Sequence, residues 1–183
     1  MTSRALIAVA DGSQDLETIT VLDVLRRAGV EVVLASIEER RMVTCALGTR
    51  LTADTMLVDV LAQDFDLIVL PGGMPGAQRL GEHAPLAERV QQQAKAGKLF
   101  AAICAAPAFA LQPFGVLRQR RMTCYPAASD KLSGCTYVDQ PVVIDGNCIT
   151  AQGPASALEF ALTLAEQLVG KNTRKEVEKA MLV

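Results

Sequence analysis

Residues 5–10 are apolar at every position, over the length of one β-strand. A continuous apolar run of this length is typical of a strand buried on both faces. The run ends at a turn with a helix-capping residue, residues 11–13, and residues 16–28 then carry apolar side chains at helical spacing before Gly29 ends the helix. The residues expected on the inward face of this helix are Leu16, Ile19, Val24 and Leu25.

The same alternation continues along the chain. Further strands are predicted at 30–36, 65–70 and 98–103, with a helix over 86–96 and another from residue 105. Strands that are apolar on both faces belong to parallel sheets covered by helices on each side. The order of strands and helices therefore predicts an α/β sandwich with a mostly parallel central sheet and right-handed crossovers.

The last third of the chain is less regular. Residues 138–144 and 148–151 are predicted to pair as a hairpin around the Asp-Gly-Asn turn at 145–147. A closing helix is predicted over 156–169. At 183 residues, with no internal repeat, the chain is expected to form a single domain over residues 1–183.

Composition narrows the function classes. The 18 basic and 20 acidic residues are interspersed and the net charge is −2, so we expect no specific nucleic-acid binding. Residues 99–117 carry no charge, but two prolines and a glycine interrupt them, so a membrane span is not expected. The apolar start is too short for a secretory signal. We therefore expect a soluble, cytoplasmic protein without a membrane partner.

The cysteines are odd in number, widely spaced and without a CxxC pair, and His83 is the single histidine. This pattern argues against a zinc site and favours free thiols, one of them reactive. The five are Cys45, Cys104, Cys124, Cys135 and Cys148.

Unusual residues follow three of the predicted strands. They are residues 11–17, the Pro-Gly-Gly-Met-Pro-Gly stretch at 71–76, and Cys104. In open α/β sheets the active site lies at the carboxyl ends of the strands. We therefore expect the three segments to meet in one site.

Cys104 ends a predicted strand and is followed at once by a predicted helix, which is the arrangement of a nucleophile elbow. The helix N-terminus would lower the pKa of the thiol well below its ordinary value, and the amide of Ala105 could bind an oxyanion. The alternative is that Cys104 is a small buried apolar residue, the commoner situation of a cysteine. The glycines that usually flank an elbow are absent.

Glu17 and Gly73 are the other candidates. Glu17 lies in the first turn of a helix, where a carboxylate favours the positive helix end; pointing inward, it would instead become a buried proton donor to a thiolate. Gly73 either makes a tight connection or brings its N–H close to a substrate oxygen. No Gly-Lys-Ser/Thr follows, so this loop is not a phosphate loop.

His83 is expected in a solvated loop, which leaves Cys104 without a histidine base. Tyr125 could still approach the pocket. Cys45, Cys135 and Cys148 are interpreted as structural, and so is Cys124 unless its neighbour Tyr125 brings it to the site.

Several motifs recur in the order of a known family. They are Asp15-Leu16-Glu17-Thr18, Leu70-Pro71-Gly72-Gly73, Gly76-Ala77-Gln78, Ala101-Ala102-Ile103-Cys104-Ala105, Pro126 with Asp130-Lys131, and Gln152-Gly153-Pro154-Ala155 followed by Glu159-Phe160-Ala161-Leu162. Over nearly the whole chain they resemble the ThiJ/PfpI superfamily, in the branch of the Parkinson-disease protein deglycase and bacterial YajL.

This resemblance implies a flavodoxin-like α/β sandwich and a homodimer. It implies a reactive Cys104 hydrogen-bonded to a protonated Glu17, with the backbone N–H groups of Gly73 and Ala105 as oxyanion donors. It also implies glutathione-independent glyoxalase or deglycase activity, or redox-regulated chaperone function in the oxidative stress response. Tyr125 stands where several members have a histidine. Ala105 stands where protease-like members have one, so peptidase activity is not expected.

Two functions are therefore expected as alternatives. In the first, Cys104 and Glu17 act on small aldehydes or on glycated proteins and nucleotides, with no metal or organic cofactor. In the second, Cys104 is oxidised to a sulfenic or sulfinic acid in a non-enzymatic sensor or chaperone. The homodimer is expected to use the first helix, through Val21, Val24 and Leu25 beside Arg26 and Arg27.

Overall fold

The centre of the molecule is a seven-stranded sheet with the order β10-β11-β7-β6-β1-β2-β5. The computed structural model describes residues 2–183. Every neighbouring pair in this sheet is parallel except β10 and β11, which form the expected hairpin. The strands are β1 (Arg4–Val9), β2 (Glu31–Ser36), β5 (Thr55–Met56), β6 (Leu67–Leu70), β7 (Leu99–Ile103), β10 (Val142–Asp145) and β11 (Cys148–Ala151).

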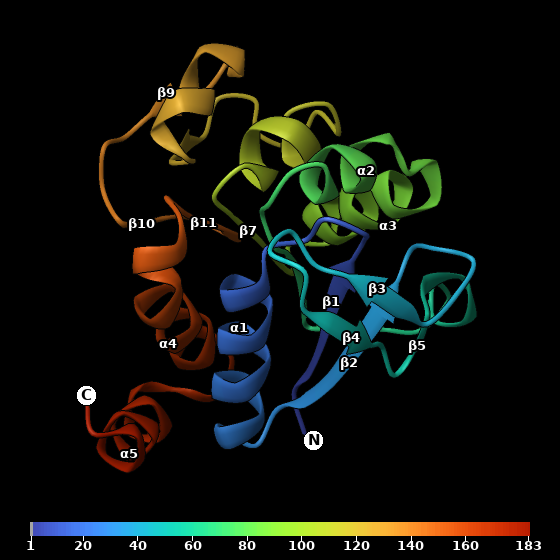
Figure 1. Ribbon diagram of the computed structural model, residues 1–183. Helices are drawn as coiled ribbons and strands as arrows, with labels where there is room; N and C mark the ends of the chain where they lie inside the picture. The colour runs from blue at the N-terminus through green and yellow to red at the C-terminus, as the bar shows by residue number, and fades with distance from the viewer. Residues whose placement is uncertain (1) are drawn as a thin grey trace.

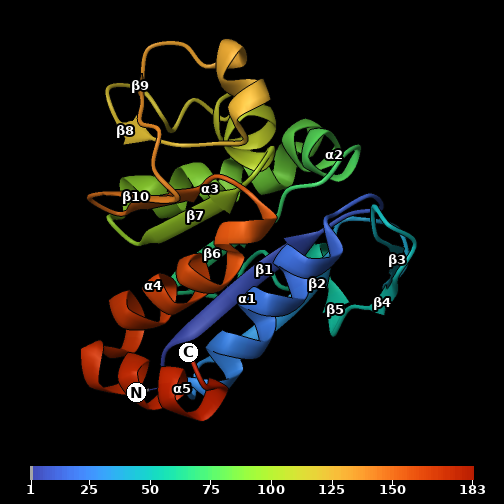
Figure 2. The same cartoon turned by 60° about the vertical axis from the view of Figure 1, so that its left-hand side comes forward.

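Helices cover both faces of the sheet. α1 (Asp15–Arg27) and α4 (Ala157–Val169) pack side by side on one face, and α5 (Lys171–Met181) packs against α4. α2 (Gly76–Glu82) and α3 (Ala84–Lys95) lie on the other face, as Figures 1 and 2 show. β1, β6 and β7 are almost entirely buried. The predicted α/β sandwich with a mostly parallel sheet is therefore confirmed.

The orientation of α1 differs from the predicted one, in which Leu16 and Ile19 faced inward. Its buried residues are Glu17, Thr18, Val21, Val24 and Leu25, whereas Leu16 and Ile19 are 51% and 42% exposed. The helix thus turns a carboxyl group toward the core and two large apolar side chains outward. The expected dimer contact through Val21, Val24 and Leu25 is wrong for the same reason, because those three side chains are already used within the subunit.

Short elements that the hydrophobic pattern did not reveal fill the rest of the chain. β3 (Met42–Thr44) and β4 (Arg50–Thr52) form a small hairpin, and β8 (Arg121–Met122) pairs with β9 (Thr136–Tyr137). η1 (Leu57–Asp59), η3 (Pro126–Lys131) and η4 (Pro154–Ser156) are short 3₁₀-helices.

Two predicted elements differ from the structure. The helix expected from residue 105 is a π-helical segment, η2 (Pro107–Leu111), and the strand expected over 138–144 is limited to β10. No helix within residues 2–183 is long and apolar enough to cross a membrane.

Candidate active site

The carboxyl ends of β1, β6 and β7 lie next to one another, because these strands are neighbours in the sheet. The three segments predicted to meet therefore do so. The loop after β1 is joined to the loop after β6 by a hydrogen bond from Gln14 N to Gly72 O of 2.8 Å. The side chain of Gln14, rather than a residue of the preceding turn, caps α1 by accepting from Glu17 N at 2.8 Å.

Cys104 occupies a sharp turn at the end of β7. Its φ angle is +63°, in the left-handed region that non-glycine residues seldom adopt. Neighbouring backbone holds it there: Cys104 N donates to Ala151 O at 2.9 Å, and Cys104 O accepts from Tyr125 N at 2.7 Å. The residue is only 9% exposed. A residue held in this rare conformation at a strand end is typical of a functional site.

Glu17 lies beneath the cysteine with no exposed surface. Its Oε2 accepts a hydrogen bond from Gly72 N at 2.8 Å, and its carboxyl group faces the Cys104 side chain closely enough for the two to influence each other's pKa. Among the described residues Oε1 has no hydrogen-bond partner, and the Cys104 side chain is the neighbouring group that can exchange a proton with it. Because Oε2 already accepts from an N–H group, the proton of a neutral Glu17 belongs on Oε1, where it can be donated to sulfur.

The loop after β6 leaves room for this contact because it lacks side chains. A Cβ atom on Gly72 would lie 2.5 Å from Cys104 Cβ and 2.8 Å from Glu17 Oε2. Gly73 has a φ angle of +84°, and a Cβ there would lie 2.5 Å from Gln14 N. The N–H groups of Gly73 and Ala105 lie near the Cys104 sulfur and lower the pKa of its thiol. Both predicted oxyanion donors therefore converge on the sulfur.

The acid–base properties of the two side chains are coupled. Burial raises the pKa of Glu17 to about 7, against the smaller opposing effect of its hydrogen bonds with Gly72 and Cys104. Burial and the Glu17 carboxylate raise the pKa of the Cys104 thiol to about 12, although the N–H groups of Gly73 and Ala105 act in the opposite direction. The predicted lowering of the Cys104 pKa is therefore wrong for the state in which Glu17 is ionised. Thiolate can form readily only as the partner of a protonated Glu17.

Tyr125 reaches the site and His83 does not. A Cβ atom on Gly153 would lie 3.5 Å from Tyr125 Cδ2 and 4.0 Å from Cys104 Sγ, so the tyrosine ring and the sulfur border the same glycine. His83 instead caps α3, where its Nδ1 accepts from Leu86 N at 3.2 Å. Burial lowers the pKa of His83. The expectation that it is a solvated loop residue is corrected to that of a half-buried helix cap.

The other four cysteines are free thiols, three of them buried and Cys135 partly so. Burial raises the pKa of Cys45 to about 11, and that of Cys124 to about 11. Cys124 stays buried although it precedes Tyr125. No cluster of three His, Cys, Asp or Glu side chains suited to a metal occurs within residues 2–183.

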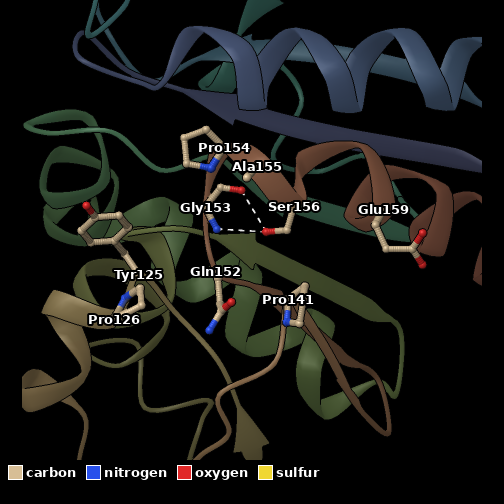
Figure 3. A pocket seen from close by; sticks show the side chains of 9 residues that line it. All are labelled: Tyr125, Pro126, Pro141, Gln152, Gly153, Pro154, Ala155, Ser156 and Glu159. Carbon is tan, nitrogen blue, oxygen red and sulfur yellow. Dashed lines mark hydrogen bonds between the residues drawn. The ribbon is translucent and has the colours of Figure 1, made fainter.

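A hollow of about 460 Å³ was not predicted; Tyr125 and Gly153 line it, and Cys104 lies behind Gly153 rather than in its wall. Figure 3 shows Tyr125 at one end and Glu159 at the other, with Gly153 and Ser156 between them. The Gln-Gly-Pro-Ala motif at 152–155 was the sequence signal for one wall. The lining residues, called here the Tyr125 hollow, are Tyr125, Pro126, Pro141, Gln152, Gly153, Pro154, Ala155, Ser156 and Glu159.

Hydrogen bonds that join the β3–β4 hairpin to the segment between β1 and α1 were also not predicted. Asp11 Oδ1 accepts from Thr44 N at 2.9 Å, and the carboxylate of Asp15 accepts from Leu47 N and Thr49 N. These hydrogen bonds lower the pKa of each aspartate, outweighing the effect of burial. The hairpin thereby braces the loop that leads into Glu17.

Comparison with known proteins identifies relatives over the whole chain. The DJ-1/PfpI family matches residues 3–167. Protein DJ-1 homolog B of Arabidopsis thaliana is 43% identical over 183 residues, which cover 100% of this chain and 42% of that protein. The chain spans less than half the length of the two Arabidopsis relatives it matches.

Two further relatives match along nearly their full length. Glutathione-independent glyoxalase DJR-1.2 of Caenorhabditis elegans is 36% identical over 181 residues, which cover 98% of this chain and 95% of that protein. The crystal structure of Drosophila melanogaster DJ-1beta has a TM-score of 0.97 at 41% identity, covering 100% of this chain and 99% of that chain.

Proposed function

Because the chain belongs to the DJ-1/PfpI family, we propose that it is a glutathione-independent glyoxalase that converts small 2-oxoaldehydes to 2-hydroxy acids through Cys104 and Glu17. The resemblance read from the motifs is confirmed at the level of the family, and one relative is named a glyoxalase of this kind. The observation that carries the proposal is the fully buried Glu17 carboxyl group facing Cys104, with two backbone N–H groups near the sulfur.

The first step is addition to the aldehyde. The Cys104 thiolate attacks the aldehyde carbon of methylglyoxal and forms a hemithioacetal, and the aldehyde oxygen receives a proton. While negative charge develops on that oxygen, the N–H groups of Gly73 and Ala105 are positioned to stabilise it, because they already point at the sulfur that forms the new bond.

The second step is an isomerisation in which Glu17 moves protons. Its carboxylate takes the C1 proton of the hemithioacetal and passes it to the ketone oxygen to give an enediol. Glu17 then takes the proton of the C1 hydroxyl and delivers it to C2. This produces a thioester of lactate on Cys104, which water hydrolyses to lactate and the free thiol. A pKa of about 7 suits this work, since near neutral pH Glu17 is present in both protonation states.

Deglycation would begin in the same way. A glycated amine or thiol carries the dicarbonyl-derived carbon as a hemiaminal or hemithioacetal, and attack by Cys104 would release the protein or nucleotide group. The alternative to catalysis is redox sensing, in which two equivalents of a peroxide oxidise Cys104 through a sulfenic to a sulfinic acid and are themselves reduced to water or alcohol; the protonated Oε1 of Glu17 would stabilise the product by a hydrogen bond. Both functions use one sulfur, so only a rate measurement separates them.

The test is turnover of methylglyoxal without glutathione, followed as D- or L-lactate formed. We expect turnover by the parent chain and none by Cys104→Ser. Cys124→Ser is the matched control, because Cys124 is likewise buried but its thiol is outside the Cys104–Glu17 pair. Equal lactate formation by the parent and Cys104→Ser would refute the enzyme.

We further propose that the chain forms a homodimer through the exposed part of α1. Leu16 and Ile19 present their apolar side chains there, and Leu47, at the tip of the neighbouring β3–β4 hairpin, is 82% exposed. Asp15 joins that hairpin to α1 through Leu47 N, so the three apolar side chains belong to one region of the surface. A second copy would cover this apolar surface by two-fold symmetry.

A further inference from the structure

We propose that the Tyr125 hollow receives the side group of the substrate, and that it selects flat, uncharged, apolar groups, so that aryl 2-oxoaldehydes such as phenylglyoxal are preferred to methylglyoxal. This inference rests on the proposed function, since it concerns which 2-oxoaldehyde the Cys104 site takes. It adds a specificity-determining role for Tyr125.

The position of the hollow supports this. Gly153 forms part of its wall, and a Cβ atom there would approach both Tyr125 Cδ2 at 3.5 Å and Cys104 Sγ at 4.0 Å. Tyr125 is also joined directly to the cysteine, because its N–H donates to Cys104 O at 2.7 Å. A carbonyl carbon bonded to sulfur would therefore have its substituent at the entrance of the hollow.

The size of the hollow exceeds what methylglyoxal needs. Its volume is about 460 Å³, whereas a protein cavity of about 150 Å³ is enough to bind benzene. A methyl group would leave most of the space to water. A phenyl ring would displace that water from apolar walls, and the exposed Tyr125 side chain offers it an aromatic neighbour.

The chemistry of the walls selects against charge. Prolines and an alanine, Pro126, Pro141, Pro154 and Ala155, supply much of the lining. No lysine, arginine or histidine occurs among the described residues that line it, so a phosphate or carboxylate on the substrate would find no cation. The single charged lining residue, Glu159, is itself bound by Arg174 Nη2 at 3.0 Å and 2.9 Å.

Several polar groups of the walls are already hydrogen-bonded. Ser156 Oγ accepts from Gly153 N at 3.1 Å and donates to Gly153 O at 2.9 Å, as the dashed lines in Figure 3 show. Gln152 Nε2 donates to Asp139 Oδ1 at 2.7 Å. Groups that are already hydrogen-bonded within the protein are not free to bond to a ligand. An apolar occupant is therefore favoured over a sugar, whose hydroxyl groups would need free partners.

Phenylglyoxal would react through the same steps as methylglyoxal. Phenylglyoxal forms a hemithioacetal with Cys104, the proton moves from C1 to C2, and hydrolysis of the thioester consumes one water to give mandelate and the free thiol. The aryl ring stays in the hollow throughout. An aromatic contact of this kind, together with the buried area, corresponds to a preference of about tenfold.

The first experiment does not depend on turnover. The rate of Cys104 alkylation, followed by peptide mapping, is measured with phenacyl chloride and with chloroacetone, which differ only in phenyl against methyl. The ratio of the two rates is compared with the ratio for N-acetylcysteine. We expect the protein ratio to exceed the free-thiol ratio by about tenfold.

Four variants locate the effect. Tyr125→Phe keeps the ring and should keep the ratio, whereas Tyr125→Ala removes a wall and should lower it toward that of the free thiol. Ala155→Leu fills the hollow and should lower it also. Ala62→Leu is the matched control, since Ala62 is exposed and precedes β6, so it lies toward the amino-terminal end of that strand, whereas the site follows the carboxyl end.

The second experiment measures kcat/KM for phenylglyoxal and methylglyoxal. A parent ratio above one that falls in Tyr125→Ala and Ala155→Leu but not in Ala62→Leu supports the inference. An alkylation ratio equal to that of the free thiol, or one unchanged in Tyr125→Ala, overturns it and indicates that another chain covers the hollow. Absence of Cys104-dependent turnover with an intact alkylation ratio refutes the glyoxalase alone, and the hollow then stands as a site for aryl carbonyl compounds.

Discussion

Replacing Glu17 by glutamine tests whether burial keeps this carboxyl group protonated. Glutamine has the same shape, its Oε1 can still accept from Gly72 N, and its amide can still donate toward Cys104. The variant therefore removes the titration while leaving the packing and both hydrogen bonds in place. Any pH-dependent difference in stability between the two proteins then belongs to the carboxyl group.

The magnitude follows from the two pKa values. In the folded protein burial raises the pKa of Glu17 from 4.5 to about 7. A raised folded pKa means that the folded state binds the proton more tightly, so its contribution to stability is complete below about pH 4.5 and is lost as pH rises to about 7. The loss is about 3 kcal/mol in all, and most of it falls between pH 5 and pH 8.

The assay is urea unfolding of the parent chain and Glu17→Gln at pH 5 and pH 8, with a reductant present to keep the thiols free. Relative to the parent, Glu17→Gln should become more stable by about 2 to 3 kcal/mol on going from pH 5 to pH 8. Parallel pH dependence in the two proteins would refute the reasoning, because Glu17 would then titrate as an ordinary exposed carboxyl group.

The other predictions concern the same site and the proposed dimer. Glu17→Gln should lower methylglyoxal turnover by about 10²- to 10⁴-fold while iodoacetamide still labels Cys104; turnover near that of the parent would exclude a proton-transfer role. In the parent chain, Cys104 should be the first cysteine alkylated, at a rate that rises with pH through about 7, where the pair loses its first proton, and then levels off. Faster labelling of Cys45 or Cys124, or a rate that first rises near pH 9, would contradict this. Gly72→Ala should abolish turnover in a chain that still folds by circular dichroism, because its Cβ would displace Cys104 or Glu17; retained turnover would contradict the close packing. Sedimentation at micromolar concentration should show a dimer that Ile19→Lys dissociates, and a monomeric parent chain would rule the dimer out.

Much of the architecture could be read from local patterns. Strands that are buried on both faces must be apolar at every position, so β1, β6 and β7 stand out as continuous runs, and parallel strands require the helices between them. The position of Cys104 at the end of such a strand, and the glycines after β6, then placed the candidate site at the carboxyl ends of the central strands. These features depend on neighbours in sequence, and the sequence by itself determined them.

The orientation of α1 could not be read in this way. Its pattern allowed Leu16 and Ile19 to face inward, and helical periodicity by itself does not distinguish that face from the one that buries Glu17. Residues far along the chain determine the orientation: Gly72 N donates a hydrogen bond to one carboxyl oxygen, and the Cys104 side chain faces the same group. Those contacts offset the burial of a polar side chain, and they exist only after the sheet has formed.

The acid–base properties and the shape of the site also depend on the tertiary structure. A helix N-terminus suggested a lowered thiol pKa, but the folded protein surrounds Cys104 with buried groups and an acid, which raise it while Glu17 is ionised. The Tyr125 hollow likewise joins residues separated by up to 34 positions, from Tyr125 to Glu159. Strand and helix patterns are local properties of the chain, whereas a pKa and a cavity depend on which distant groups exclude water together, and only the tertiary structure determines that.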